Sequence, residues 1–223
     1  MLADEVLAPG KAFGYPNGYA YYVTGRGGVL GDVDADVVAS AFGFFAPALI
    51  RTMWERGVVV EGARAAATRY ADACAEYGRR RMVAFARAER LAELAGAIAA
   101  GVDASGLALF AGWRAHPLPD DSPGRAYQLL HVLRELRGSV HVLAVVASGL
   151  TPLRAVLASG GEENAHRFGW PQPYPGVARS AKEPAEVLTD GVLARLYGEV
   201  LDEAQAAELV RLVLDLRRCF AFG

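Results

Sequence analysis

The chain has 223 residues, 53% of them hydrophobic and 22% charged, with a formal net charge of -2 at pH 7. This length suffices for a full hydrophobic core, and the small charge excludes a general attraction to nucleic acid or anionic membranes. No apolar run approaches the ~18 residues of a membrane span. The first five residues include two acidic and no basic side chains, and the N-terminus lacks the apolar core of a signal peptide. We therefore expect a cytoplasmic protein with no membrane association, for which nucleic acid is an unlikely partner.

Cysteines and acidic residues give little support for a metal or cofactor. Cys74 and Cys219 are too few and too isolated for a disulfide framework or a cysteine-based zinc site. Asp32, Asp34 and Asp36 alternate, but the glycine and glutamate that an EF-hand needs further along are missing. The sequence therefore predicts neither a metal nor a cofactor.

The first half of the chain carries helix signals. Asp34 is placed to cap a helix over residues 35–42, Pro47 to begin the next one, and Gly57 to end it. Alanine-rich residues 61–81 and the leucine-spaced residues 89–102 predict two more helices. Only short runs such as residues 58–60 resemble strands, and nothing obvious pairs with them.

The longest apolar-periodic stretch is 124–148, which predicts a central helix with two faces. The apolar face is made of Leu129, Val132, Leu133, Leu136, Val140 and Leu143. The polar face is made of His131, Arg134, Glu135, Gly138 and His141. After Gly138 the sequence is apolar on nearly every side, so we expect this half of the helix to be buried on all faces.

The chain ends in further helix signals. Thr151 and Pro152 restart a helix after the central one, a proline- and aromatic-rich segment follows at 166–176, and helices are predicted over about 183–200 and 203–220, the second with a capping box at Asp202 and Gln205. We predict an all-α fold, a single multi-helix orthogonal bundle over residues 1–223 around the central helix. A C-terminal helical subdomain, 183–223, is the alternative.

The polar face of the central helix is the strongest candidate for a functional site. An imidazole beside a carboxylate is suited to acid–base chemistry, so His141, Glu135 and Arg134 are the candidate catalytic residues. An arginine binds carboxylate or phosphate by two parallel hydrogen bonds. Arg137 is therefore predicted to help bind an anionic small molecule, and His131 on the same face is predicted to contact it as well. In the alternative interpretation His131, Arg134 and Glu135 are merely solvated and His141 is a core histidine, with Glu135, Arg134 or a tyrosine as its partner.

Aromatic residues elsewhere in the chain suggest walls for such a pocket. Tyr21, Tyr22, Trp170 and Tyr174 are the candidates, because small-molecule sites are lined mainly by apolar and aromatic side chains.

Several blocks of the sequence resemble an actinobacterial family of helical proteins, some of which carry a helix-turn-helix label. The blocks are 25–33, 37–42, 45–49, 133–141, 147–152 and 168–175. Arg137, Gly138 and His141 match the recurring arginine-glycine-histidine feature of this family, whereas Leu136 stands where the family often has histidine. The resemblance implies a helical fold and, for the labelled members, regulation of transcription.

Three functions follow as hypotheses. The first is a small-molecule-binding protein, an enzyme or an accessory factor of specialised metabolism, using His141, Glu135 and Arg134. The second is a helix-turn-helix transcription regulator, supported by the basic residues between Arg79 and Arg90 and expected to dimerise. The third is a non-catalytic subunit that docks on a partner through residues 42–54. A homodimer and a heteromeric partner both remain open.

Overall fold

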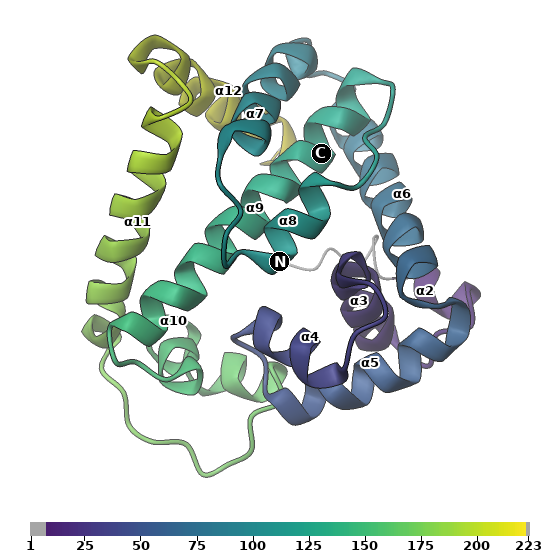
Figure 1. Cartoon of the computed structure of the whole chain (residues 1–223), viewed down its shortest axis with the longest axis vertical. Coiled ribbons are helices and arrows are strands. Elements are labelled where there is room, and N and C mark those ends of the chain that lie inside the picture. The colour runs from purple at the N-terminus through teal and green to yellow at the C-terminus, as the bar shows by residue number, and fades with distance from the viewer. Residues whose placement is uncertain (1–7, 222–223) are drawn as a thin grey trace.

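The computed structural model describes residues 8–221, and within this range every regular element is helical (Figure 1). This confirms the predicted all-α class. The helices, in chain order, are α2 (Pro9–Ala12), α3 (Gly18–Gly27), α4 (Ala35–Phe42), α5 (Pro47–Glu61), α6 (Ala63–Arg81), α7 (Ala88–Gly101), α8 (Ala108–Arg114), α9 (Ser122–Ala147), α10 (Pro152–Arg167), α11 (Glu183–Gly198) and α12 (Glu203–Ala221), with short 3-10 turns η1 (Gly28–Leu30) and η2 (Arg179–Lys182).

Helix α9 is the centre of the bundle. It crosses the molecule diagonally and packs against α6, α7, α8 and α11, while α3, α4 and α5 form a second group of helices below it (Figure 1). The Asp121 side chain caps the start of α9 by accepting a hydrogen bond from the Gly124 amide. Its core-facing residues Val132 and Leu136 are fully buried, so the predicted central helix is confirmed.

Local capping signals in the sequence give the helix ends correctly at several places. Asp34 caps α4 and Thr151 caps α10, in both cases by accepting a hydrogen bond from a backbone amide of the first turn. Pro47 begins α5. Asp202 and Gln205 bond each other's backbone amides, which is the reciprocal pattern of a capping box.

The prediction that Gly57 ends α5 is wrong. The helix continues to Glu61 and ends at Gly62, so the residues 58–60 considered as a strand are its last turns. Gly57 is buried where α5 crosses α3, and a Cβ atom there would lie 1.9 Å from Thr24 Oγ1. The glycine therefore permits a close helix crossing rather than a helix end.

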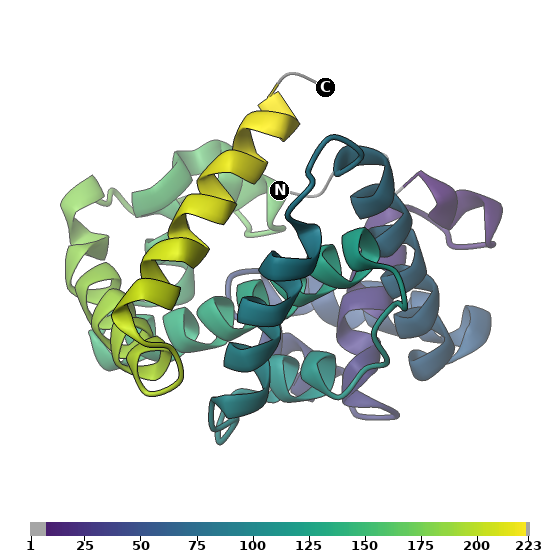
Figure 2. The ribbon, with the colours of Figure 1, turned by 90° about the horizontal axis from the view of Figure 1, so that it is seen from above.

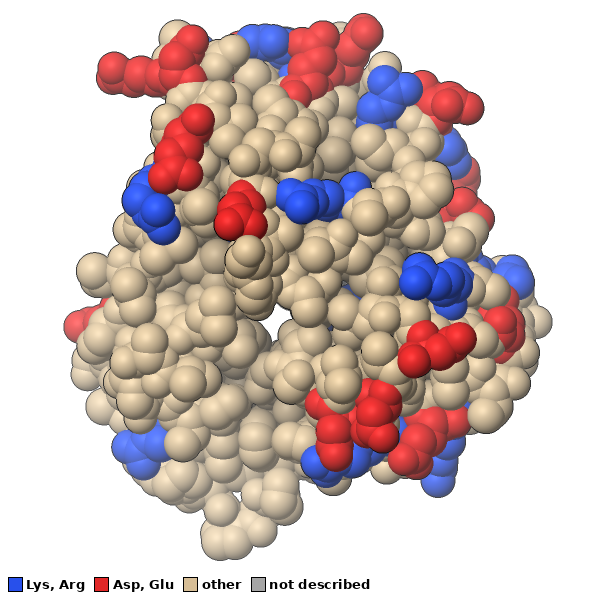
Figure 3. Space-filling view, in the orientation of Figure 1, with Lys and Arg blue, Asp and Glu red and all other residues tan. Residues whose placement is uncertain are grey.

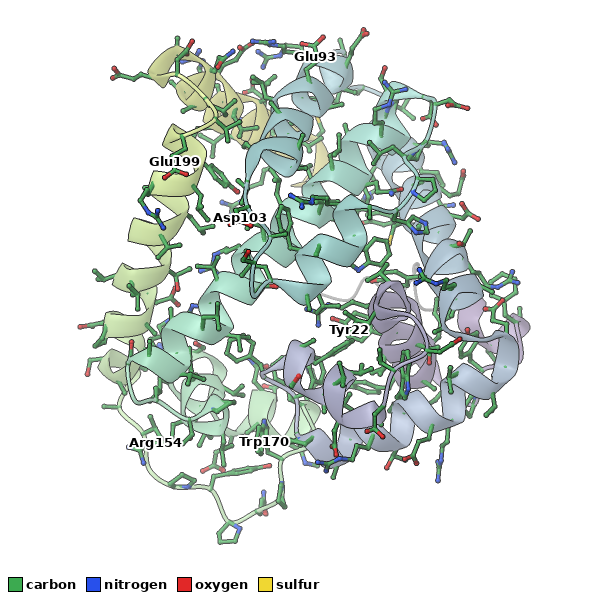
Figure 4. The ribbon with its side chains drawn as sticks, viewed as in Figure 1. Tyr22, Glu93, Asp103, Arg154, Trp170 and Glu199 are labelled. Atoms are coloured by element: carbon green, nitrogen blue, oxygen red, sulfur yellow. The ribbon has the colours of Figure 1, made fainter. Side chains whose placement is uncertain are left out.

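The prediction that α9 is buried on all sides after Gly138 is also wrong. Val140, Ala144 and Val145 are buried, but Leu143 and Val146 are 52% and 63% exposed. One flank of this half of α9 faces an apolar groove of about 460 Å³ between α9 and α11, whose rim includes Asp103 and Glu199 (Figure 4).

Residues 42–54, the predicted docking face, include both buried and exposed side chains, and docking there stays a prediction. Phe42 and Trp54 are buried in the main core, and Ile50 between them is completely inaccessible. The exposed residues of α5 are the charged Arg51, Glu55 and Arg56 together with Pro47, Ala48 and Val59. No single helix of residues 8–221 is long and apolar enough to cross a membrane; α9 and α10 meet that criterion only jointly, and they are bent by 112°.

The two C-terminal helices lie at the periphery. Helix α11 packs on α9 through buried Ala185 and Thr189, and α12 packs on α7 through Leu209, Leu212 and Leu216. Viewed from above, α12 runs along the outside of the molecule (Figure 2). These three leucines belong to the same hydrophobic core as α3 to α9.

Candidate functional site

The most unusual feature of the interior is a buried ion pair between α3 and α9. Arg26 Nε donates to Glu135 Oε1 at 2.9 Å, and Arg26 Nη2 donates to Glu135 Oε2 at 2.8 Å. Burial alone would raise the pKa of Glu135, but the Arg26 guanidinium outweighs it and lowers this pKa to about 2. Glu135 is therefore ionised and held by two parallel bonds at every pH near neutrality.

Arg26 is itself fixed by its surroundings. Its guanidinium lies over the Phe42 ring, 4.3 Å from the centroid, and its carbonyl oxygen accepts a hydrogen bond from Trp113 Nε1 at 3.0 Å. These contacts join α3, α4, α8 and α9 at one point.

A second arginine shares the same carboxylate. Arg134 Nη1 donates to Glu135 Oε1 at 2.8 Å, and the Arg134 side chain is 49% exposed, whereas Glu135 is almost fully buried. In the described part of the chain, Glu135 is the only carboxylate in ion-pair contact with Arg26 or Arg134. Two guanidiniums and one carboxylate leave this cluster with one uncompensated positive charge.

His131 lies against this cluster in its neutral form. Burial lowers the pKa of His131 to about 4, although Glu135 Oε1 is 3.7 Å from its Nε2 atom. The buried Nε2 has no hydrogen-bond partner, and the ring packs edge-on against Trp113 with centroids 4.6 Å apart. His131 therefore behaves as a core residue beside the ion pair.

His141 occupies a different position, at the junction of α9 and α11. Its Nδ1 lies 2.8 Å from Thr189 Oγ1, and the Thr189 hydroxyl donates to the Ala185 carbonyl at 2.6 Å. Because the hydroxyl proton is used there, Nδ1 must carry a proton and donate to Thr189, which leaves the lone pair on Nε2. Burial lowers the pKa of His141, so the ring is a neutral acceptor at neutral pH.

The structure thus brings together only part of the predicted polar face. His131, Arg134 and Glu135 form one cluster, whereas His141 binds Thr189 and not Glu135, Arg134 or a tyrosine. Arg137 turns to α11 and forms an ion pair with Glu186 at 3.1 Å.

Arg26 is the essential partner that the sequence did not indicate. It is 109 positions from Glu135 and sits in a glycine-rich stretch that resembles a helix end. In the sequence Glu135 stands directly after Arg134, so the cation that the sequence offered was this neighbour and not Arg26.

The predicted aromatic walls do not surround one pocket. Tyr21 and Tyr22 lie on α3 and are buried in the main hydrophobic core. In Figure 4 Tyr22 lies inside the molecule, well apart from Trp170. Trp170 donates to the Phe44 carbonyl at 2.9 Å and belongs with Tyr174 to a smaller apolar cluster beside α10. The aromatic ring in contact with His141 is that of Phe44, 5.4 Å away between centroids.

Open space lies on α9 between Arg134 and His141. A Cβ atom at Gly138 would meet nothing within 4 Å, so the glycine does not serve a close backbone approach. The space-filling view shows an opening through the molecule between α9 and α4 (Figure 3). Within residues 8–221 no group of three or more histidine, cysteine or carboxylate side chains is arranged to hold a metal ion.

The basic cluster considered for DNA contact is largely neutralised. Arg79 pairs with Asp121, Arg87 with Asp215, and Arg90 with Glu208. On the face of Figure 3, charges of both signs are interspersed. These arginines link α6 and α7 to neighbouring elements.

The fold and this site define an all-helical protein with a buried Arg26–Glu135 ion pair that the half-exposed Arg134 joins. A family model described as a helix-turn-helix family matches residues 1–181, which is most of the chain. The chain therefore belongs to this helix-turn-helix family, as the resemblance of its sequence blocks indicated. Neither a curated protein nor a solved structure matches it. The matched region ends just before α11.

Proposed function

We propose that the protein binds a small organic anion on the face of α9 between Arg134 and His141. The observation that supports this most directly is the uncompensated positive charge of the Arg26–Glu135–Arg134 cluster. Arg26 is buried and bound to Glu135 by two parallel hydrogen bonds, so the half-exposed Arg134 is the guanidinium that a ligand can reach. A carboxylate is the natural partner of a guanidinium, because both groups are planar and the two bonds are parallel.

The rest of this face defines the ligand further. Arg134 and His141 are seven residues apart, which corresponds to about 10 Å along a helix. The free Nε2 of neutral His141 accepts a hydrogen bond, and the Phe44 ring beside it offers an apolar surface. The ligand is therefore an elongated acid with a carboxylate at one end, an apolar middle and a hydroxyl or amide donor at the other end. The resemblance to actinobacterial proteins supports specialised metabolism as its source.

Binding is the better-supported role than catalysis by a His–Glu pair. Glu135 is held ionised by two arginines and does not contact His141, so it is unsuited to exchanging a proton with that ring. In this proposal His141 contacts the ligand as a hydrogen-bond acceptor, and Arg137, whose charge Glu186 already compensates, is outside the site.

Titration calorimetry with 4-hydroxycinnamate as the probe tests this proposal. Replacing Arg134→Met removes the charge-assisted contact, which is worth about 1.5–3 kcal/mol, so we expect affinity to fall by roughly one to two orders of magnitude. Gly138→Leu should weaken binding by filling the open space. Arg137→Gln, on the same helix and equally exposed, is the matched control and should leave affinity unchanged.

The two ends of the site are distinguished by a second probe. Cinnamate lacks the hydroxyl group, so it should bind the unmodified protein more weakly than 4-hydroxycinnamate does, and His141→Phe should erase the difference between the two. Equal losses for the Arg134 and Arg137 variants would contradict the proposed site.

Regulation of transcription is a second candidate, supported by the family match. Helices α4 and α5, joined by four residues, form a helix-turn-helix-like pair in which α5 would be the DNA-reading helix. Its exposed Arg51 pairs with Asp36, and Glu55 lies on the same exposed side, which weakens the electrostatic support for a DNA contact. Fluorescence anisotropy of a random-sequence DNA duplex at low salt tests it. Binding that declines steeply with salt and is lost in Arg51→Glu/Arg56→Glu would support this function.

A further inference from the structure

Helix α12 has two apolar faces, and only one of them is used within the chain. Leu209, Leu212 and Leu216 are buried against the core, whereas Val210 and Leu214 are 59% and 50% exposed. The exposed residues continue a regular stripe along the outer side of the helix, made of Glu203, Ala207, Val210, Leu214 and Arg217.

The spacing of this stripe is that of a helix–helix seam. Its members follow one another at intervals of four, three, four and three residues, which is the 3.5-residue period of a coiled coil. A surface helix needs only one apolar stripe to pack on its own domain. The second stripe on α12 therefore calls for a partner outside the described fold.

The charges at the two ends of the stripe indicate which partner fits. Glu203 lies at the first residue of α12 and Arg217 near its end, and neither forms an ion pair within residues 8–221. Glu203 and Arg217 are each seven residues away from Val210, while Ala207 lies three residues before it and Leu214 four residues after it. An antiparallel copy of the same helix, centred on Val210, would place Glu203 opposite Arg217 twice, Ala207 within one residue of Leu214 of the second copy twice, and Val210 against itself.

We infer that the protein forms a homodimer through antiparallel pairing of two α12 helices about a two-fold axis at Val210. The interface is isologous, as closed dimers require. Figure 2 shows α12 on the outside of the molecule, where a second copy can approach it. The stripe covers 15 residues, about 21 Å of helix, so the contact is small and the dimer is expected to depend on protein concentration. This inference does not depend on the proposed anion site.

Cross-linking through the two-fold axis tests the geometry. In a Cys219→Ser background, Val210→Cys places two cysteines against each other at the axis, and mild oxidation should give a covalent dimer of about twice 23.7 kDa. Ala204→Cys is the matched control, since residue 204 is exposed on the same helix but lies off the stripe. It should cross-link at least tenfold more slowly. Equal cross-linking of both variants, or none at Val210→Cys, would overturn the inference.

Charge reversal separates pairing from an effect on the helix alone. Either single reversal, Glu203→Arg or Arg217→Glu, places like charges opposite each other across the interface and is expected to weaken the dimer. Each also weakens the helix itself, because Glu203 and Arg217 suit the dipole of their own helix. The double variant restores opposite charges across the antiparallel interface but places both charges unfavourably for the dipole. Light scattering after gel filtration, over a range of concentrations, should show dimerisation recovered in the double variant. A double variant that remains as monomeric as the single ones would contradict antiparallel pairing.

Discussion

Glu135 is the single residue on which the interior depends most, because it is the counter-charge of the buried Arg26 and also binds the half-exposed Arg134. Replacing Glu135→Gln keeps its size but leaves Arg26 buried without a counter-charge. We expect the free energy of unfolding to fall by about 3–5 kcal/mol, the usual loss when one partner of a buried ion pair is removed. Urea denaturation measures this. Glu199→Gln, which removes an exposed partner of Arg195, should have little effect, and equal losses in both variants would contradict the assigned role.

His131 makes stability depend on pH in the mildly acidic range. Its pKa is near 6.5 in the unfolded chain and about 4 in the folded protein, so the unfolded state binds the extra proton first. The contribution of neutral His131 is fully present above pH 6.5 and is lost as the pH falls towards 4, by about 3 kcal/mol in total. Glu135, with its pKa lowered to about 2, adds a further loss below pH 4.5.

Urea denaturation at a series of pH values between 4 and 7.5 tests the His131 contribution. We expect His131→Gln to flatten the dependence of stability on pH in this interval, and the exposed His166→Gln to retain it. An unchanged slope in the His131 variant would show that other groups cause the loss.

At the residue scale the sequence identified polar side chains but not their partners. The interval of four between His131 and Glu135 follows from helix geometry, and the structure does bring them together. Arg26 and Thr189, the partners of Glu135 and His141, lie 109 and 48 positions away. Such pairings depend on the packing of whole helices, which no local pattern encodes.

At the scale of helices, two glycines that each follow an arginine inside a helix have opposite roles. Gly138 lies within α9 beside open space, and Gly57 lies within α5 where it meets Thr24. Gly138→Ala should stabilise the protein by about 0.5–1 kcal/mol, because alanine loses less backbone entropy in a helix. Gly57→Ala should destabilise it by about 1–3 kcal/mol, the typical effect of overpacking.

Thermal and urea denaturation of the two alanine variants distinguish these roles, and each variant is the control for the other. Destabilisation by Gly138→Ala would indicate that the space beside α9 is filled in solution.

The same comparison explains which element boundaries the sequence predicted. Caps such as Asp34 and Thr151 bond the first turn of their own helix, so the local sequence identifies them correctly. Gly57 was wrongly predicted to end a helix, because a glycine is needed there for a contact with another helix, which the local sequence does not show.

At the scale of the molecule, the sequence predicted the helical class and the place of the last two helices, but left open whether they form a separate unit. Three observations bear on this. The family match ends at residue 181, before α11, while the inner leucines of α12 belong to the main core. Ion pairs also join α12 to α7 and to the residue before α7, from Arg90 to Glu208 and from Arg87 to Asp215. We expect the chain to unfold as one cooperative unit.

Leu212→Ala tests this expectation, because Leu212 lies on the inner face of α12 and is completely buried. The lost burial and the cavity should cost about 2–5 kcal/mol. In a single cooperative domain this cost lowers the midpoint of the one calorimetric transition. A separate C-terminal unit would instead melt alone, as an early second transition, while the main midpoint stayed in place. Leu214→Ala, on the exposed face two residues away, should change the monomer's stability by about 0.5 kcal/mol or less. If α12 pairs as inferred, Leu214→Ala weakens the dimer. The two leucine variants thereby separate the packing of α12 on its own domain from its pairing with a second copy.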